Sequence, residues 1–472
     1  MTTKNCSVLV IGAGPGGYVA AIRAGQLGLD TIIVESEKAG GTCLIRGCIP
    51  SKAIIHAANK FHEMGKHTEK GHMGIRLPKP ATISMSGVVR WKEGIVDKLN
   101  KGVEHLLKSA GVELVTGWAN FTSSHTCEVK SGKDTITIEA EHVILANGST
   151  PIELPFMPFG DDVISSKEAL NLKKLPEDLV VIGGGYIGLE LGCAYAMMGS
   201  NVTVIEAMDS VLPLFDDELK RPVQLFMRKN GVKIKTNCLA KSAEKAEGKT
   251  IVTYEDSAGN SHTINADKVL VTVGRKPNSQ NWGIENMGVE TDEKGFVKID
   301  GRCSTNINNV WCIGDLSGDP MLAHRASAQG EMVAEIISGE NRIFEPAAIP
   351  AIVFTEPEIV CVGMSPNEAE EEGIQIITGK FPLAANGRAL TMEAEKTGGF
   401  LRVVAKKDTH EILGIQCVGS HVSELCGEFI LAIEMGAVLE DISGTIHPHP
   451  TMSESFHEGV LSTLGHAIHI VK

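Results

Sequence analysis

Cys43 and Cys48, separated by four residues, are the side chains of this sequence whose spacing is best suited to chemistry. A disulfide between them would close only six residues, and the chain-entropy estimate for so short a loop is about 2 kcal/mol, less than a longer bridge gives. We therefore favour a role in thiol–disulfide exchange over a role in stability. The alternatives are two unrelated buried cysteines or half of a zinc site, although no second Cys/His pair stands nearby to complete a tetrahedral cage.

The residues after this pair are expected to form a helix. Pro50 suits the first position of a helix, and residues 53–64 continue a helical pattern. Both sulfurs would then lie near a helix N-terminus, where the helix dipole favours a thiolate. Arg46 stands between the two cysteines and adds a cation that can shift their reactivity.

A second group of candidate residues lies near the C-terminus, in His447-Pro-His449-Pro-Thr-Met-Ser-Glu454. Five of the 16 histidines fall in the last 26 residues, but neither a cysteine nor a fixed ligand spacing accompanies them, so we predict no metal site. Thr451 and Glu454 match a helix capping box, which is the structural alternative to a catalytic role for Glu454.

These residues need a scaffold, and a glycine-rich turn indicates which one. Residues 8–11 predict a buried parallel strand, residues 18–27 a helix, and residues 31–34 a second strand that ends on Glu35. The turn between the first strand and the helix contains Gly12, Gly14 and Gly17. In a Rossmann unit such glycines permit the tight turn, the approach of a pyrophosphate and close helix–strand packing, and the acidic residue bonds a ribose hydroxyl.

The chain contains this pattern twice. A strand over 179–182 leads into a turn, a strand over 202–205 ends on Glu206, and each marker lies 171 residues after its counterpart. The glycines of this second turn are Gly183, Gly185 and Gly188. Two units in one register predict two bound dinucleotides. Glu206 would bond a 2′-hydroxyl and repel a 2′-phosphate, and residues 207–210 offer no arginine for that phosphate, which favours NAD over NADP.

With these motifs the sequence resembles the flavin-dependent pyridine nucleotide disulfide oxidoreductases over essentially its whole length. The resemblance rests on both glycine turns with Glu35, on residues 41–52 with the two cysteines, and on four further stretches: Gly183 to Glu190, Val273-Gly274-Arg-Lys-Pro-Asn278, Ile313-Gly-Asp315 and His447 to Glu454. One departure is Ala146-Asn147-Gly148-Ser149, where the family commonly has Ala-Thr-Gly-Ser.

The resemblance implies an α/β fold with two Rossmann-like dinucleotide-binding domains and a C-terminal α+β dimerisation domain. It assigns FAD to the first unit and NAD to the second. The contacts expected besides the glycine turns are Gly148, Asp315 and Lys52 for FAD, and Gly274 for NAD. Lys52 and Glu190 match the family's buried ion pair near flavin N5, although each alone would pass for a helix-surface charge. Asp315 alone would pass for an ordinary turn residue.

Among the family, the sequence is most similar to members that oxidise a protein-bound dihydrolipoyl dithiol. In that chemistry His449 is the base for the substrate thiol, Glu454 orients it, and electrons pass from the Cys43–Cys48 pair through FAD to NAD. The implied partners are a second copy of the chain, forming a homodimer with shared active sites, and the lipoyl domains of a 2-oxoacid dehydrogenase or glycine cleavage complex.

The rival interpretations are an NADPH-linked glutathione-type reductase, a mercuric reductase and a subunit that only binds nucleotides. Glu206 and a C-terminus without cysteines argue against the first two. The cysteines, His449 and Glu454 would be surplus to a subunit that only binds nucleotides.

Composition and length set the remaining expectations. A net charge of −14 with no dense Lys/Arg block argues against nucleic acid, and no run of 18 apolar residues could cross a membrane. The first residues run straight into a strand pattern without a signal peptide, so we expect a cytoplasmic protein.

With 472 residues the chain should contain several domains. We predict an FAD-binding domain over 1–150, an NAD-binding domain over 151–273, a central portion over 274–348 that rejoins the FAD domain, and a dimerisation domain over 349–472. A helix over 85–110 and a strand-rich excursion over 112–138 should interrupt the first domain.

Overall fold

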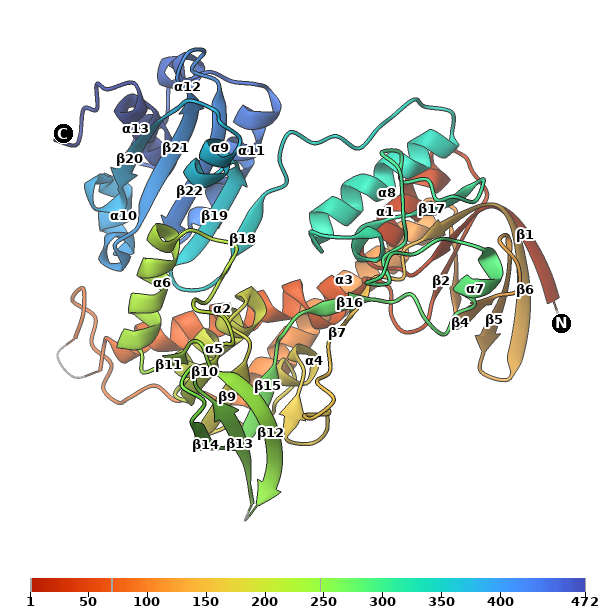
Figure 1. The fold of residues 1–472 in the computed structure, drawn as a ribbon, viewed down its shortest axis with the longest axis horizontal. Helices are drawn as coiled ribbons and strands as arrows, with labels where there is room; N and C mark the ends of the chain where they lie inside the picture. Colours follow the sequence, from red (N-terminus) through yellow and green to blue (C-terminus); the bar gives the residue numbers. More distant parts are fainter. Residues whose placement is uncertain (1, 69–70, 247, 472) are drawn as a thin grey trace.

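The computed structural model describes residues 2–68, 71–246 and 248–471, which form three regions, each built around one main sheet (Figure 1). The first sheet has the order β3-β2-β1-β6-β5-β4, with β17 beside β6. Its strands are β1 (Thr2–Ile11), β2 (Thr31–Glu35), β3 (Glu113–Thr116), β4 (Trp118–Phe121), β5 (Thr126–Ser131), β6 (Asp134–Leu145) and β17 (Val310–Cys312). The associated helices are α1 (Pro15–Gln26), α3 (Met85–Ser109), α7 (Ile284–Met287) and α8 (Ala323–Ile337).

The expected strand-rich stretch over 112–138 is present as β3, β4, β5 and the start of β6, but these strands belong to the first sheet and do not interrupt the domain. β3 pairs in parallel with β2, and β5 pairs antiparallel with the first half of β6. β6 is twelve residues long. Its last residues therefore extend beyond β5 and pair with β17 along the same edge. The pairing of β17 also returns the chain after residue 274 to the first sheet.

The second region repeats the Rossmann pattern with a parallel sheet of order β11-β10-β9-β15-β8 and an antiparallel sheet of order β12-β13-β14. Its strands are β8 (Val163–Ile164), β9 (Asp178–Ile182), β10 (Asn201–Ile205), β11 (Lys233–Lys235), β12 (Leu239–Ala246), β13 (Lys249–Glu255), β14 (Ser261–Ala266) and β15 (Lys268–Val271). Its helices are α4 (Ser166–Ala169), α5 (Tyr186–Met198) and α6 (Asp217–Lys229). Two short antiparallel strands, β7 (Ser149–Pro151) and β16 (Arg275–Pro277), form the paired entrance and exit of this region.

The third region, coloured blue in Figure 1, is an antiparallel sheet of order β18-β19-β22-β21-β20 with helices packed on it. Its strands are β18 (Ala351–Val353), β19 (Glu358–Gly363), β20 (Ile376–Pro382), β21 (Phe400–Lys406) and β22 (Ile412–Gly419). Its helices are α9 (Pro366–Glu371), α10 (Gly387–Thr391), α11 (Cys426–Glu434), α12 (Leu439–Gly444) and α13 (Glu454–Thr463). Phe429 of α11 and Phe456 of α13 pack edge to face with ring centroids 5.2 Å apart, which fixes α13 on the core.

Across the residues that the structure describes, we find no helix both long enough and apolar enough to span a membrane.

Candidate active site

The two cysteines lie on either side of Gly47. Cys43 lies in a π-helical turn, Thr42–Arg46, and Cys48 is the first residue of α2 (Cys48–Gly65). The helix therefore begins before Pro50, which is its third residue and not its first. A proline is tolerated there because the N–H groups of the first turn have no partner within the helix. Both sulfurs are free thiols, which corresponds to the reduced form of the pair.

The two thiols differ in acidity. A hydrogen bond with the Cys43 thiol and the positive charge of Lys52 lower the pKa of Cys48 to about 7, against the opposing effect of desolvation. The same bond, together with burial, raises the pKa of Cys43. Near neutral pH, Cys48 is thus partly a thiolate and Cys43 is a protonated thiol. Arg46 is engaged elsewhere, in a two-pronged ion pair with Glu37, and it is Lys52 whose positive charge lowers the pKa of Cys48.

Lys52 and Glu190 come from different regions and form an ion pair. Lys52 Nζ, on α2, lies 2.9 Å from Glu190 Oε2, on α5. Glu190 is only 4% exposed, so it is not a helix-surface charge. Its second oxygen, Oε1, accepts a 2.9 Å hydrogen bond from the backbone N–H of Phe354. The pair therefore lies where all three regions meet.

The two glycine turns have the backbone that their sequence demands. Gly12 and Gly183 have φ of +95° and +98°, in the left-handed region that favours glycine. A Cβ on Gly17 or Gly188 would lie only 1.8 or 2.5 Å from the carbonyl oxygen of the turn's first glycine. Only glycine at these positions allows the close contact of helix and strand. A Cβ on Gly185 would instead meet open space. Both turns are therefore cradles of the kind that receive a pyrophosphate.

The acidic residues at the strand ends hold these turns in the same way. Glu35 accepts a 2.8 Å bond from the Ala13 N–H, and Glu206 accepts a 2.5 Å bond from the Gly184 N–H. An ionised carboxylate offers about four lone-pair sites, so either side chain can accept a further bond from a ribose hydroxyl.

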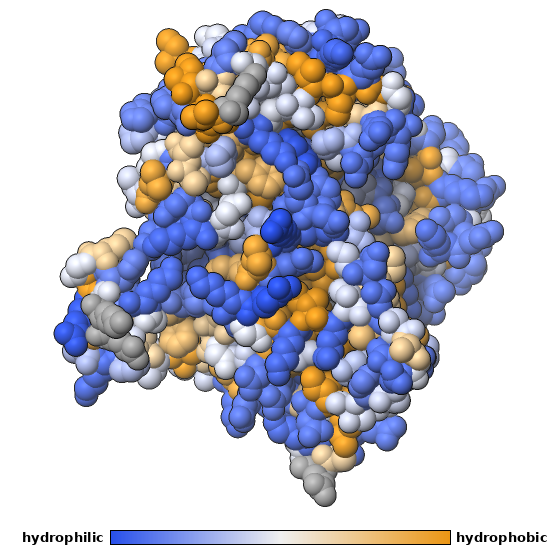
Figure 2. All heavy atoms as spheres, turned by 60° about the vertical axis from the view of Figure 1, so that its left-hand side comes forward, coloured by the Kyte–Doolittle hydropathy of each residue, from blue (hydrophilic) through white to orange (hydrophobic). Residues whose placement is uncertain are grey.

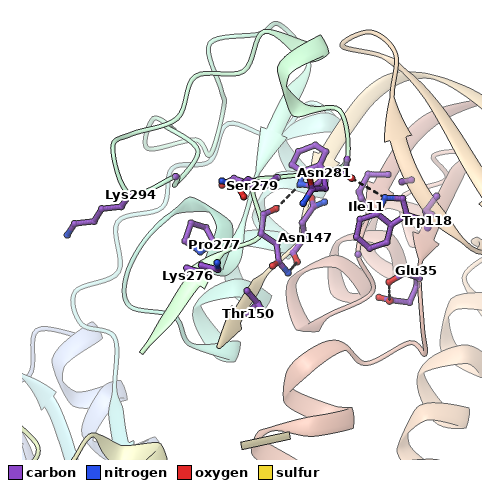
Figure 3. A pocket seen from close by; sticks show the side chains of 18 of the residues that line it. Ile11, Glu35, Trp118, Asn147, Thr150, Lys276, Pro277, Ser279, Asn281 and Lys294 are labelled. Atoms are coloured by element: carbon purple, nitrogen blue, oxygen red, sulfur yellow. Dashed lines mark hydrogen bonds between the residues drawn. The ribbon is translucent and has the colours of Figure 1, made fainter. Parts of the chain in front are cut away.

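A pocket of about 570 Å³ opens at the carboxyl ends of β1, β2 and β6. In Figure 3, Ile11, Glu35 and Trp118 line one side, Lys276 and Pro277 lie across from them, and Asn147 stands between. The Oδ1 atom of Asn147 is buried without a hydrogen-bond partner in the described part of the chain. An acceptor in this state fits a bound group that supplies a donor. The pocket, the cradle and Glu35 together fit the adenosine end of FAD.

Asp315 lies in a short 3-10 turn, Gly314–Ser317, directly after β17. Its carboxylate accepts a hydrogen bond from the Ser149 hydroxyl, which in turn accepts a 2.8 Å bond from Arg275 Nε. Asp315 therefore connects the first sheet to both strands, β7 and β16, that lead into the second region. Gly148 and Gly274 adjoin these strands with φ of +70° and +125°.

His449 and Glu454 form the hydrogen-bonded pair that the sequence suggested. His449 Nδ1 lies 2.8 Å from Glu454 Oε1 and must donate, because a carboxylate can only accept, which leaves Nε2 as the free base in the neutral ring. Burial alone would raise the pKa of Glu454, but bonds from the Thr451 N–H and from His449 outweigh it, and the pKa lies below its ordinary value.

The capping box is only half formed. Glu454 accepts from the Thr451 N–H, but the Thr451 hydroxyl donates to the Pro448 carbonyl and does not cap α13. The His449 side chain is 77% exposed, and its polar contact within the described chain is to Glu454 and to neither cysteine. In the same described part, no three His, Cys, Asp or Glu side chains converge as a metal site would require.

Three residues near the dithiol were not identified from the sequence: Tyr186, Arg275 and Phe354. Burial and the charge of Glu190 raise the pKa of Tyr186 to about 12. Arg275 is close enough to Cys48 and Asp315 for their charges to act on it. A bulky residue directly after Gly185 was the visible signal for Tyr186, whereas Phe354 lies more than 300 positions after Cys48 and left no local signal.

Comparison with known proteins defines the class. The chain matches the family described as pyridine nucleotide-disulphide oxidoreductase over residues 6–330, and the dimerisation domain of that family over residues 349–460. It belongs to the pyridine nucleotide-disulphide oxidoreductase family. The predicted family and fold class, with a C-terminal dimerisation domain, are thereby confirmed.

Within this family, similar proteins of known name include dihydrolipoyl dehydrogenases. The chain is 50% identical to the dihydrolipoyl dehydrogenase of Pseudomonas aeruginosa, over 98% of each chain. It is 46% identical to that of Geobacillus stearothermophilus, over 98% of this chain and 97% of the relative.

Solved structures share the fold. The flavoprotein disulfide reductase RclA of Escherichia coli superposes with a TM-score of 0.85 at 26% identity, covering 96% of this chain and 99% of its own. LpdA of Mycobacterium tuberculosis superposes with a TM-score of 0.89 at 24% identity, covering 98% of this chain and 99% of its own.

Proposed function

We propose that this protein is a dihydrolipoyl dehydrogenase that oxidises protein-bound dihydrolipoyl dithiols and reduces NAD⁺ to NADH. The observation that supports the chemistry most directly is the asymmetric thiol pair, in which Lys52 and Cys43 favour Cys48 as a thiolate. The similarity to dihydrolipoyl dehydrogenases over nearly the whole chain supports the substrate.

The exchange begins with the pair oxidised. His449 Nε2 removes a proton from one substrate thiol, and the thiolate attacks the Cys43 sulfur, so that the Cys43–Cys48 bond breaks and a mixed disulfide forms. Cys48 leaves as a thiolate, and a low thiol pKa makes a better leaving group. The second substrate thiol then attacks the mixed disulfide and releases the cyclic lipoyl disulfide. Its proton passes to the leaving Cys43 sulfur, which becomes a thiol, while the first proton remains on His449.

The ion pair and the acidic residues serve this exchange. The Lys52 ammonium balances the charge of the Cys48 thiolate, and Glu454 keeps the His449 ring in the tautomer with a free Nε2. The first glycine turn with Glu35, Asn147 and Asp315 would hold FAD, and the second turn with Glu206 and Gly274 would hold NAD. FAD bound there would supply the two-electron chemistry that links the dithiol to hydride transfer to NAD.

We also propose a homodimer in which His449 serves the dithiol of the partner subunit. The exposure of His449 and its lack of contact with its own chain's cysteines support this arrangement. Hydrophobic side chains gather over the third region in Figure 2, and its exposed large apolar residues include Leu431, Met435, Ile446 and Ile468. As the source of substrate we propose the lipoyl domains of a 2-oxoacid dehydrogenase or glycine cleavage complex in the cytoplasm.

A steady-state comparison tests the proposal. The purified holoenzyme should form NADH from dihydrolipoamide and NAD⁺, and should show little oxidation of NADPH with glutathione disulfide. Dominant NADPH-linked reduction of glutathione disulfide would reject the proposal in favour of a glutathione-type reductase.

A further inference from the structure

Phe354 touches both partners of the ion pair beside the dithiol. It follows β18 at the start of the third region, and its ring centroid lies 4.3 Å from Lys52 Nζ. Its backbone N–H donates to Glu190 Oε1, while Lys52 Nζ donates to Glu190 Oε2. One residue of the C-terminal region thus holds the cation by its ring and the anion by its backbone.

The ring contact has a physical consequence for Lys52. The lysine side chain is 32% exposed and flexible, so the carboxylate alone leaves it room to turn toward water. The face of an aromatic ring attracts an ammonium group at this distance. The ring and the carboxylate therefore restrict Nζ from two directions.

We propose that Phe354 is a positioning residue for the thiol chemistry, which holds the Lys52 ammonium where its charge stabilises the Cys48 thiolate. The inference rests on the proposed function for the role of Cys48, but the contact itself is independent of the substrate. Through Phe354, the C-terminal region would influence the charge around the dithiol of its own chain. Its His449 would serve the dithiol of the partner subunit.

Several groups act on Cys48 and must be kept constant in a test. They are Cys43 on the preceding turn, Lys52 on α2, Glu190 and Tyr186 on α5, and Arg275 on β16. Lys52 lowers the pKa of Cys48 and Glu190 raises it, so a displaced Lys52 leaves the unfavourable carboxylate in place. The expected sign is therefore an increase in the pKa of Cys48 when the ring is lost.

The test uses FAD-loaded protein with Cys43→Ser, in which Cys48 cannot form the disulfide. A thiolate against oxidised flavin gives a long-wavelength charge-transfer band, and its loss on acidification reports the apparent pKa of Cys48. Adding Phe354→Leu should raise this pKa by about one unit, at the low end of the effect of a nearby opposite charge. Phe354→Tyr keeps the ring and should leave it within about 0.3 units.

Phe400→Leu is a matched control, because Phe400 lies in the same region under another lysine, Lys380, with 5.3 Å between Nζ and the ring centroid. It should not change the pKa of Cys48. If Phe354→Leu does not fold, trifluorophenylalanine at position 354 keeps the shape and weakens the electrostatic attraction of the ring, and should also raise the pKa.

An unchanged pKa in a folded Phe354→Leu or trifluorophenylalanine protein would overturn the inference. So would an equal increase in Phe400→Leu, because the effect would then be one of general packing. A band missing even from the Cys43→Ser parent would show that Cys48 does not lie against the flavin, against the proposed transfer of electrons from the dithiol to FAD. The same pKa comparison is then made from the pH dependence of Cys48 alkylation, measured on the tryptic peptide 47–52, with the same expected and contradicting results.

Discussion

The carboxylate of Glu206 accepts a 2.5 Å hydrogen bond from the backbone N–H of Gly184, inside the glycine turn that follows β9. Its other oxygen accepts a 2.7 Å bond from the Met208 N–H, so the side chain is fixed at the end of β10. The equivalent bond from Ala13 to Glu35 shows that this is a feature of both units and not a local accident.

The position of Glu206 predicts the choice of nucleotide. Glu206→Ala should weaken NAD binding by about 1–3 kcal/mol, because charge-assisted bonds to the ribose are lost, and should ease the exclusion of NADP. Equilibrium titration with each nucleotide measures both effects. The control is Glu206→Gln, which keeps an acceptor but loses the charge. Its affinity for NAD should lie between that of the native protein and that of Glu206→Ala. A native preference for NADP would refute this assignment.

The acidity of Cys48 predicts a pH dependence. Because its pKa is lowered to about 7, the thiolate should predominate above that pH and be lost as the pH falls through it. Alkylation of the reduced protein by iodoacetamide should follow this curve on tryptic peptide 47–52, separately from Cys43 on peptide 39–46. Lys52→Met should move the curve to higher pH, measured there on peptide 47–60 because the variant lacks the tryptic cleavage site after residue 52. An inflection near that of a free thiol, about 8.5, in the native protein would contradict the prediction.

Glu454 should matter for turnover more than for folding. Glu454→Gln can still accept the bond from the Thr451 N–H but loses the charge that supports the His449 imidazolium. We expect kcat/KM for dihydrolipoamide to fall by about 10²-fold, the low end of general-base effects, with little change in Tm. His449→Gln should cost at least as much, and the double variant little more, because the two residues act as a unit. Additive losses would argue against a single acid–base unit.

Mixed dimers test whether sites are shared between chains. Cys48→Ser and His449→Gln homodimers should each be nearly inactive. Refolding them together at equal amounts should make about half of the dimers mixed, with one intact site of two, restoring roughly a quarter of native activity. If the base and the dithiol belonged to one chain, no activity would return on mixing.

The sequence was sufficient to predict both Rossmann units, because each glycine and each acidic residue meets a separate local requirement. Gly12 and Gly183 need positive φ, and the positions of Gly17 and Gly188 leave no room for a Cβ. The pairing of β3 with β2 was missed, since it joins residues about 80 positions apart and no local pattern encodes it. The start of α2 was also missed, because a proline is acceptable anywhere in the first turn and does not mark one position.

In the candidate site too, one contact between residues close in sequence could be predicted, and one contact between distant residues could not. His449 and Glu454 are five residues apart, and their contact could be anticipated from the motif. The contact of Phe354 with Lys52 depends on how the C-terminal region lies against the other two, which is a tertiary property. The half-formed capping box has a local cause instead, because the Pro448 carbonyl, three residues earlier, competes for the Thr451 hydroxyl.

The central claim is that a dihydrolipoyl dithiol reduces the Cys43–Cys48 pair and leaves Cys48 as a thiolate beside flavin. The most direct measurement is anaerobic mixing of the oxidised holoenzyme with dihydrolipoamide in the absence of NAD, recorded as absorbance spectra. We predict the rapid appearance of a long-wavelength charge-transfer band in the native protein, and no such band in a Cys48→Ser protein that still binds FAD. A native protein without the band, or a band that persists in Cys48→Ser, would contradict the account.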